Sequence, residues 1–383
     1  MNPYYASMPT TIFEATSARA RATGAINLGQ GFPDAQGPRD VLQAAADALF
    51  NESNQYPPMS GLPGLRAAVA AHYAAHQALD LAPDEIIVTS GATEALAASI
   101  LALVRPGDEV VLLQPMYDSY LPMVRQAGGI ARLVNLQAPD WQVSDAMLAQ
   151  VFNAKTALII LNTPHNPTGS MLNAQSLAVI ADYCRRFDCV ALCDEVWEHV
   201  VFDGAAHLPL IGFPGMRERC VKIGSAGKIF ALTGWKVGWV CAAPALAQAI
   251  ARAHQFLTFT TAPNLQHAVT YGLGKPADSF TAMRADLQRS RDRLRAALDA
   301  AGYAVAPSAG TYFMSIDLAA SGLALGDVQF CDETLVDGVA AIPVSAFYAE
   351  APSFNHVRLC FAKSDATLDA AAGRLAKTRV RLA

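Results

Sequence analysis

The chain has 383 residues, with 28 lysines and arginines against 33 aspartates and glutamates and a formal net charge of −5. This length is enough for two domains with substantial cores. A mildly acidic balance without a basic arm or charge run does not predict nucleic-acid binding, and a small molecule is the expected partner. No apolar run approaches the roughly 20 residues of a membrane span. The first five residues do not resemble a signal peptide, so we expect a cytoplasmic protein.

Seven cysteines are scattered along the chain in mostly apolar settings. This pattern predicts reduced thiols in the core rather than a disulfide framework. Cys189 and Cys193 lie close together, but their segment reads as a buried strand, with no His-x-x-His or Cys-x-x-Cys partner nearby. We therefore expect no metal site.

Short apolar runs alternate with amphipathic stretches from residue 86 to about residue 243. The runs predicted as strands are 86–88, 109–113, 157–161, 190–193 and 220–224, and the stretches predicted as helices include 92–104 and 175–186. Strands that are apolar on both sides favour a mostly parallel sheet with helices on each face, which is an α/β fold. Ligands of such folds bind beyond the carboxyl ends of the strands.

The pattern changes near residue 281. A charged helix around 284–298 and short strands near 311–316 and 356–361 indicate a smaller α+β domain. We predict three parts, namely an N-terminal segment that packs with the small domain, a large domain, and the small domain itself: 1–45, 46–280 and 281–383. The chain has no internal repeat and no low-complexity linker, so the domains should be closely docked.

The first strand end with candidate chemistry is the segment Thr89–Ala95. Gly91, Ala92 and Thr93 follow a strand and open a helix, so their free backbone N–H groups would face an anion such as phosphate. An ordinary helix cap is the alternative when this motif stands alone.

Two further strand ends offer an aromatic ring and an amide. Tyr117 could lie flat on a cofactor ring, or it could be an ordinary core or surface tyrosine. Asn166 lies in Asn162–Gly169, where two prolines and a glycine restrict the backbone and hold the amide at the strand end. The amide could hydrogen-bond a ring oxygen, although an Asn-Pro turn is the ordinary alternative.

Asp194 is the first acid after the strand 190–193. A carboxylate against a pyridine nitrogen keeps that nitrogen protonated, which lets the ring accept electrons from a carbanion. Glu195 is the rival for this role, but strand alternation predicts that it points to the opposite side. A solvated acid that caps the strand is the alternative.

The segment Ser225–Lys236 is the most informative one. Small residues flank Lys228, which leaves room for a ring and favours a desolvated, partly neutral amine that can attack an aldehyde. Ser225 and Lys236 would then hold a phosphate. A solvated lysine in a surface turn is the common explanation of a Gly-Lys pair. The Ser-x-x-Lys spacing and the Thr-Gly-Trp-Lys-x-Gly that follows favour one shared pocket instead.

Arg358 lies inside the apolar strand predicted near the C-terminus. A buried guanidinium needs a partner, and its fork matches a substrate carboxylate with two parallel hydrogen bonds. A structural ion pair is the alternative.

In their order and spacing these segments resemble the pyridoxal-phosphate-dependent class I/II aminotransferases of the aspartate-aminotransferase fold type. Within that family the chain is similar to the methionine/kynurenine (glutamine transaminase K-like) group. The resemblance covers nearly the whole chain and includes Asn27–Asp34 and Asn54–Tyr56. It implies the fold type I architecture of these enzymes, pyridoxal 5'-phosphate as cofactor, and a homodimer with shared active sites.

The resemblance also implies roles for single residues. Lys228 would bind the cofactor covalently and shuttle the proton, Asp194 would pair with the pyridinium, Asn166 would bond the ring hydroxyl, and Tyr117 would stack on the ring. The residues implied to hold the phosphate are Gly91, Ala92, Thr93, Ser225, Lys236 and, from the neighbouring subunit, Tyr56. Those implied for the substrate are Arg358, the backbone of Gly31, Asn166, Phe13 and, again from the neighbouring subunit, Phe259.

One position departs from the family pattern. Three residues after Asp194, where relatives usually have a tyrosine, this chain has Trp197. A tyrosine hydroxyl would bond the cofactor's ring oxygen, whereas an indole has one N–H at a different reach and cannot accept a bond.

The implied activity is transfer of the amino group of an uncharged L-amino acid, methionine-, aromatic- or glutamine-like, to a 2-oxo acid. A cysteine-S-conjugate β-lyase, which expels a thiolate from the β-carbon, is one alternative, and a succinyl-diaminopimelate-type biosynthetic aminotransferase is another. A regulatory protein that kept the fold would be expected to lack Lys228 or to have a DNA-binding extension. The sequence shows no clear second arginine for a dicarboxylate.

Overall fold

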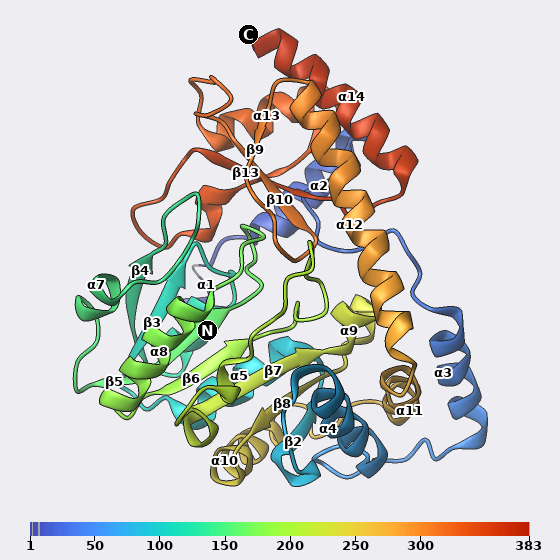
Figure 1. The fold of residues 1–383 in the computed structure, drawn as a ribbon, viewed down its shortest axis with the longest axis vertical. Helices are drawn as coiled ribbons and strands as arrows, with labels where there is room; N and C mark the ends of the chain where they lie inside the picture. Colours follow the sequence, from blue (N-terminus) through green and yellow to red (C-terminus); the bar gives the residue numbers. More distant parts are fainter. Residues whose placement is uncertain (2, 7, 383) are drawn as a thin grey trace.

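The computed structural model describes residues 1, 3–6 and 8–382. A seven-stranded sheet with the order β2-β8-β7-β6-β5-β3-β4 forms its centre (Figure 1). The strands are β2 (Ile86–Thr89), β3 (Glu109–Gln114), β4 (Ile130–Asn135), β5 (Thr156–Asn162), β6 (Val190–Asp194), β7 (Cys220–Ser225) and β8 (Gly238–Ala242). β8 runs antiparallel to both neighbours, and the other pairs are parallel. The α/β prediction is confirmed, and the sheet adds β4 and β8 to the predicted strands.

The central strands separate two hydrophobic cores, because successive side chains of a strand point to opposite faces. In β5, Leu158 and Ile160 belong to one core, and Ile159 and Leu161 belong to the other. The helices on the first face are α5 (Gly91–Leu103), α6 (Tyr120–Gln126) and α10 (Pro244–His254). Those on the second face are α4 (Pro63–Gln77), α7 (Asp145–Ala149), α8 (Ala174–Arg186) and α11 (Pro263–Leu273), with α3 (Arg39–Asn51) against α11.

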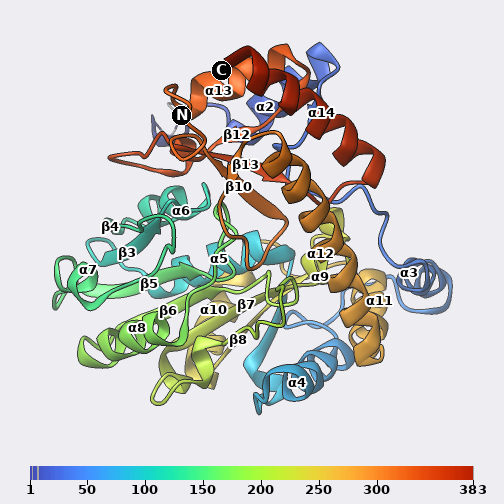
Figure 2. The same ribbon diagram turned by 45° about the horizontal axis from the view of Figure 1, so that its top comes forward.

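A smaller antiparallel sheet with the order β12-β13-β10-β9 lies above the central sheet (Figure 2). Its strands are β9 (Ala304–Val305), β10 (Phe313–Asp317), β12 (Ile342–Pro343) and β13 (His356–Cys360), and its helices are α12 (Ala277–Ala300), α13 (Asp327–Val336) and α14 (Asp365–Leu382). Of the N-terminal elements α1 (Pro3–Ala6), α2 (Ile12–Thr23) and β1 (Ile26–Asn27), β1 pairs in parallel with β11 (Val339–Ala340). The start of the chain therefore packs beside this second sheet.

The domain boundaries remain a prediction. The boundary at residues 45 and 46 falls inside α3, and the boundary at residues 280 and 281 falls inside α12. Figure 1 shows α12 running from the second sheet down to α9 (Ala226–Ile229) and α11, so this helix joins both layers.

Two simple properties bear on the sequence expectations. All seven cysteines are buried and free, as expected of core thiols. Within the described part of the chain, no helix has both the length and the apolar character needed to cross a membrane.

Candidate active site

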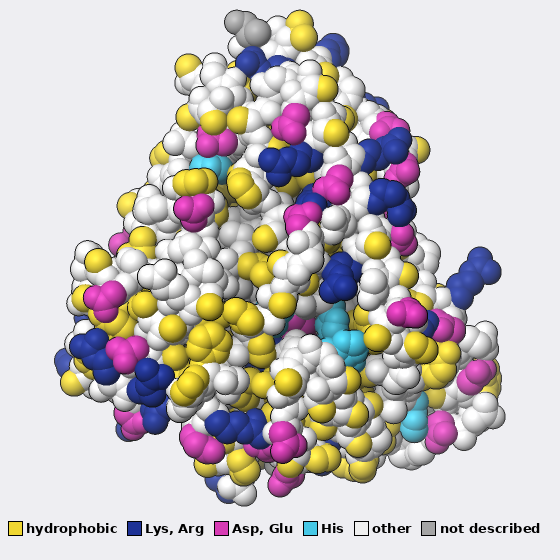
Figure 3. Space-filling view, in the orientation of Figure 1, with side chains coloured by type: hydrophobic (Ala, Val, Ile, Leu, Met, Phe, Trp, Pro, Cys, Tyr) yellow, Lys and Arg dark blue, Asp and Glu magenta, His cyan; other side chains and the backbone are white. Residues whose placement is uncertain are grey.

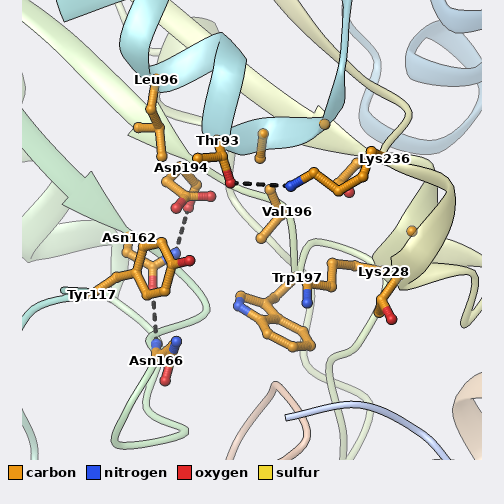
Figure 4. A pocket seen from close by; sticks show the side chains of 15 residues that line it. Thr93, Leu96, Tyr117, Asn162, Asn166, Asp194, Val196, Trp197, Lys228 and Lys236 are labelled. Atoms are coloured by element: carbon orange, nitrogen blue, oxygen red, sulfur yellow. Dashed lines mark hydrogen bonds between the residues drawn. The ribbon is translucent and has the colours of Figure 1, made fainter. Parts of the chain in front are cut away.

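The carboxyl ends of β5, β6 and β7 meet the N-terminus of α5 at a cavity of about 160 Å³ (Figure 4). Every residue predicted to bind the cofactor, except Tyr56, lines this cavity. The full lining is Gly91, Ala92, Thr93, Leu96, Tyr117, Asn162, Asn166, Asp194, Val196, Trp197, Ser225, Gly227, Lys228, Thr233 and Lys236. The structure therefore brings together residues from segments that lie far apart in the sequence.

One end of the cavity has the features of an anion site. The turn from β2 into α5 needs a positive φ of 76° at Gly91, and the helix then directs free N–H groups into the cavity. Lys236 Nζ donates to Thr93 Oγ1 at 3.3 Å, which places an ammonium group at the same point. A Cβ at Gly238 would lie 2.8 Å from the carbonyl carbon of Gly91, so the glycine allows β8 to approach this turn.

The other end of the cavity is formed by Asp194, the last residue of β6. Tyr120 donates to its Oδ2 at 2.6 Å, and the Asn162 amide donates to its backbone carbonyl at 2.7 Å. Its second oxygen, Oδ1, is buried and has no hydrogen-bond partner among the described residues. Burial raises the pKa of Asp194, while the Tyr120 bond and the charge of Lys228 lower it. An unpaired buried carboxylate oxygen is costly, so this end is suited to a ligand with an N–H donor.

Glu195 points away from the cavity, as strand alternation predicts. It accepts a hydrogen bond from His207 at 2.9 Å and pairs with the ammonium of Lys222. Glu198 contacts the same ammonium at 2.5 Å, and all three side chains are fully buried. The Lys222 ammonium lies between the two carboxylates and leaves them no need for a metal ion.

Lys228 lies on α9 between the two ends of the cavity. Its Nζ is 4.7 Å from the centre of the Trp197 ring, and Tyr312 donates to its backbone carbonyl at 3.1 Å. Burial lowers the pKa of Lys228 to about 8, although the charge of Asp194 acts in the opposite direction. A substantial neutral fraction near pH 7 to 8 makes this amine a nucleophile and a base.

Asn166 and Arg358 form a pair at the edge of the cavity. Arg358 Nη1 donates to Asn166 Oδ1 at 2.7 Å, and Nη2 donates to the carbonyl of Gly29 at 2.6 Å. Since a guanidinium only donates, Asn166 must turn Oδ1 toward it and Nδ2 away from it. The structure therefore presents an amide donor on the other side of Asn166.

Arg358 is fully buried and forms no ion pair with the described residues. Burial lowers its pKa to about 9, which still leaves it charged at neutral pH. The rings of Phe313, Phe347 and Phe13 lie 3.9, 5.0 and 5.2 Å from the guanidinium carbon, and Nε has no partner. A buried cation with unused donors is suited to a carboxylate ligand.

The remaining predicted residues lie outside the cavity. Gly31 lies under the Phe313 ring that covers Arg358, because a Cβ added to this glycine would come within 2.5 Å of that ring. Tyr56 and Phe259 contact each other edge-on, with ring centroids 5.7 Å apart, and expose 84% and 39% of their surface. These two rings therefore do not complete the cavity from within the same chain.

Sequence analysis missed Asn162, Tyr120 and Phe313 as site residues. Asn162 starts the segment chosen for Asn166, and its Oδ1 accepts from the Asn166 backbone N–H at 2.7 Å. Tyr120 starts α6, three residues after Tyr117. The end of β5 marks Asn162, whereas no local pattern marks Tyr120 or Phe313.

The site as a whole combines an anion pocket, a desolvated amine, an unpaired carboxylate oxygen and a buried arginine. A phosphorylated pyridine aldehyde fits this set, because its phosphate matches the anion pocket, its aldehyde matches the amine, and its protonated ring nitrogen matches the carboxylate oxygen. The carboxylate of an amino acid matches the buried arginine.

Comparisons with known proteins agree with this assignment. The family model "Aminotransferase class I and II" matches residues 23–375. A Mycobacterium tuberculosis protein named "Probable N-succinyldiaminopimelate aminotransferase DapC" is 44% identical over 380 residues, which cover 96% of this chain and 95% of the relative. The Escherichia coli methionine aminotransferase is 41% identical over 371 residues, with coverage of 96% and 95%.

Among solved structures, the N-succinyldiaminopimelate aminotransferase of Mycobacterium tuberculosis superposes with a TM-score of 0.94 at 43% identity, over 98% of this chain and 99% of that one. A match of this extent covers both sheets and the residues that line the cavity. The chain therefore belongs to the class I and II aminotransferases and is a pyridoxal-phosphate-dependent aminotransferase.

Proposed function

We propose that the enzyme transfers the amino group of an uncharged L-amino acid, methionine-, aromatic- or glutamine-like, to a 2-oxo acid. The observation on which this proposal rests is Arg358, a buried cation that has no ion-pair partner among the described residues and lies among phenylalanine rings at the edge of the cavity. Its charge selects a carboxylate, and the apolar rings around it disfavour a second charged group on the substrate.

The cavity residues would hold pyridoxal phosphate by its two ends. Thr93, Lys236 and the α5 N-terminus would bind the phosphate, with Ser225 beside them. Asp194 would keep the ring nitrogen protonated through its unpaired oxygen. When bound, the cofactor supplies an electron sink that stabilises negative charge on the α-carbon of the amino acid.

The remaining roles follow from the same contacts. Asn166 would donate its Nδ2 to the ring oxygen, because Arg358 already engages its Oδ1. Tyr117 would cover the ring face. Lys228 would attach to the cofactor and, once released, its neutral amine would take the α-proton and return it to another atom. Two of the three unused N–H donors of Arg358 would hold the carboxylate during this transfer.

The substrate class is the part of the proposal that rests most on the cavity lining. Its only cationic side chains among the described residues are those of Lys228 and Lys236, and both have assigned roles. The relatives named for methionine and for N-succinyldiaminopimelate match the chain to similar extents, so a biosynthetic aminotransferase is the second candidate. A β-lyase is the third, because the same negative charge can expel a thiolate.

A homodimer is part of the proposal. Tyr56 and Phe259 form an exposed aromatic pair, which is the kind of surface that a partner subunit covers. In a dimer they would reach the neighbouring cavity, where Tyr56 would touch the phosphate and Phe259 the substrate side chain. We also propose a cytoplasmic location, supported by the seven free buried cysteines.

A panel of amino donors with several 2-oxo acids tests the proposal. We expect L-methionine, aromatic amino acids and L-glutamine to have higher kcat/KM than L-aspartate and than N-succinyl-diaminopimelate. A preference for the succinylated donor would replace the proposal with the second candidate. Release of pyruvate and ammonia from a cysteine S-conjugate, in excess over amine transfer, would favour the third.

A further inference from the structure

Three histidines gather on the opposite side of the segment that follows β6. His72 and His76 are four residues apart on α4 and so lie on the same helix face, and His199 comes from the loop after β6. The Nε2 atoms of His72 and His199 are 2.8 Å apart. Phe280 of α12 covers the group, with its ring 5.1 to 5.4 Å from the three imidazoles. None of these residues lines the cofactor cavity.

The spacing of the three imidazoles suits a metal ion. With metal–nitrogen distances of about 2.0–2.1 Å, the centroids of three imidazoles around a tetrahedral ion lie about 5 Å apart. The observed centroid distances are 4.4 Å for His72–His76, 4.8 Å for His72–His199 and 5.6 Å for His76–His199. His76 needs a side-chain rotation to direct a nitrogen at the point between His72 and His199. It has room for this rotation because it is exposed at the end of α4.

The electrostatic surroundings allow the three rings to act as neutral ligands. His72 and His199 share one hydrogen bond between their Nε2 atoms, so one ring donates there and the other accepts through a neutral, lone-pair nitrogen. The charged groups that act on the cluster are the Glu198 carboxylate, which attracts a cation, and Lys222 and Arg284, which repel one. One carboxylate faces two cations, so these charges do not favour a metal ion and the imidazoles themselves must supply the affinity.

An ion can reach this cluster from solvent. His199 and Phe280 line a second cavity, of about 320 Å³, between α12, α9 and the loop that contains Pro38. Figure 3 shows histidine side chains together in a hollow in the middle of this face. Water in that hollow can complete the coordination sphere of the metal.

We propose that His72, His76 and His199 form a binding site for a divalent transition metal that prefers imidazole, such as zinc or nickel. The ion would replace the hydrogen bond between His72 and His199 and would recruit His76 as third ligand. It would tie α4 to the loop after β6, in which His199 lies two residues beyond Trp197, outside the cofactor cavity. The cysteine-based expectation of no metal site did not weigh these histidines, which only the fold brings together.

Titration of the purified holoenzyme with Zn²⁺ and Ni²⁺, followed by calorimetry, tests the proposal. We expect one ion per chain, and at least tenfold weaker binding in both His76→Ala and His199→Gln. His76 is exposed, so its replacement should not disturb folding. His267→Ala is the matched control, since this histidine is partly exposed on α11 and its Nε2 lies 3.9 Å from Glu52, away from the cluster. The metal affinity of this variant should equal that of the parent protein.

Thermal unfolding gives an independent readout. At one fixed ion concentration Tm should rise by the same amount in the parent and in His267→Ala and by less in His76→Ala, because a ligand that binds only the folded state stabilises it in proportion to its affinity. The cofactor's absorption spectrum should stay constant through the titration, which excludes metal binding at the cofactor. Equal affinities in His76→Ala and His267→Ala, or no binding below millimolar concentration, would overturn the proposal and leave the cluster as aromatic packing around Phe280.

Discussion

Replacing Arg358 with alanine tests the proposed carboxylate site most directly. The guanidinium is fully buried and spends one donor on Asn166 and one on the Gly29 carbonyl, which leaves donors for a substrate carboxylate. Removing one partner of a buried, hydrogen-bonded charge pair costs about 2–5 kcal/mol. At about 1.36 kcal/mol per tenfold, Arg358→Ala should lower kcat/KM for an L-amino acid by about 30- to 5,000-fold.

The assay compares an L-amino acid with the amine that lacks its α-carboxylate. In the parent enzyme the amino acid should react far better than the amine, and in Arg358→Ala the two should become similar, because only the first uses the arginine. Arg358→Lys keeps the charge and loses the forked shape of the guanidinium, so its kcat/KM should lie between those of the parent enzyme and of Arg358→Ala. Both variants remove the Arg358 bond to Asn166, so the absorption spectrum of the bound cofactor is the control, and it should be the same as in the parent enzyme.

Arg291→Ala serves as the matched control. Arg291 is also a buried arginine, and it bonds Asp203 and the carbonyl of Ser308 rather than any cavity residue. Its loss should lower stability and leave the discrimination between amino acid and amine intact. A loss below threefold in kcat/KM for Arg358→Ala, with the cofactor bound, would refute the assignment.

Three further predictions concern the lysines and the tryptophan. In protein stripped of cofactor, acylation of Lys228 should rise with a midpoint near pH 8, because the neutral amine is the nucleophile; peptide mapping that finds this midpoint on Lys236 instead would contradict it. Lys222→Met leaves two buried glutamates without their cation and should lower the free energy of unfolding by about 3–5 kcal/mol in urea titrations. Lys377→Met should change it little, because Lys377 is exposed and its partner Asp337 keeps the ion pair with Arg381. Trp197→Tyr should lower the pKa of the imine between the cofactor and Lys228, which is read from the cofactor's absorption, since a phenol that donates to the ring oxygen favours the ionised form of that oxygen. An unchanged pKa would mean that the indole, a water or another residue already supplies the bond.

The central sheet was predictable where its strands are buried on both faces. β3, β5 and β6 are mainly apolar runs between turn signals, β7 is apolar apart from Lys222 and its last two residues, and their positions match the predicted ranges within two residues. β4 is an edge strand with partly exposed side chains, so its apolar signal is weak. β8 starts at Gly238, the last residue of the Thr-Gly-Trp-Lys-x-Gly motif. The segment was therefore interpreted as a binding motif and its strand was not predicted.

The site was predictable in its membership but not in its contacts. Parallel strands bring their carboxyl ends to one edge, so Asn166, Asp194 and Ser225 were expected to meet. The bond between Arg358 and Asn166 joins residues 192 positions apart, and it depends on how the second sheet sits on the first. Local patterns contain no information of that kind, and the same holds for the hydrogen bond from Tyr120 to Asp194.

The segment 194–199 explains why distant residues should matter for catalysis. Asp194 and Trp197 face the cofactor cavity, whereas Glu195 and Glu198 point away to Lys222. The backbone that positions Asp194 and Trp197 is therefore anchored on its other side by Glu195 and Glu198, whose charges Lys222 neutralises. Loss of the Lys222 cation would leave the two glutamates to separate or take up protons, and the backbone between them positions Trp197. Lys222→Met should therefore weaken cofactor binding as well as folding, even though Lys222 is not one of the residues that line the cavity.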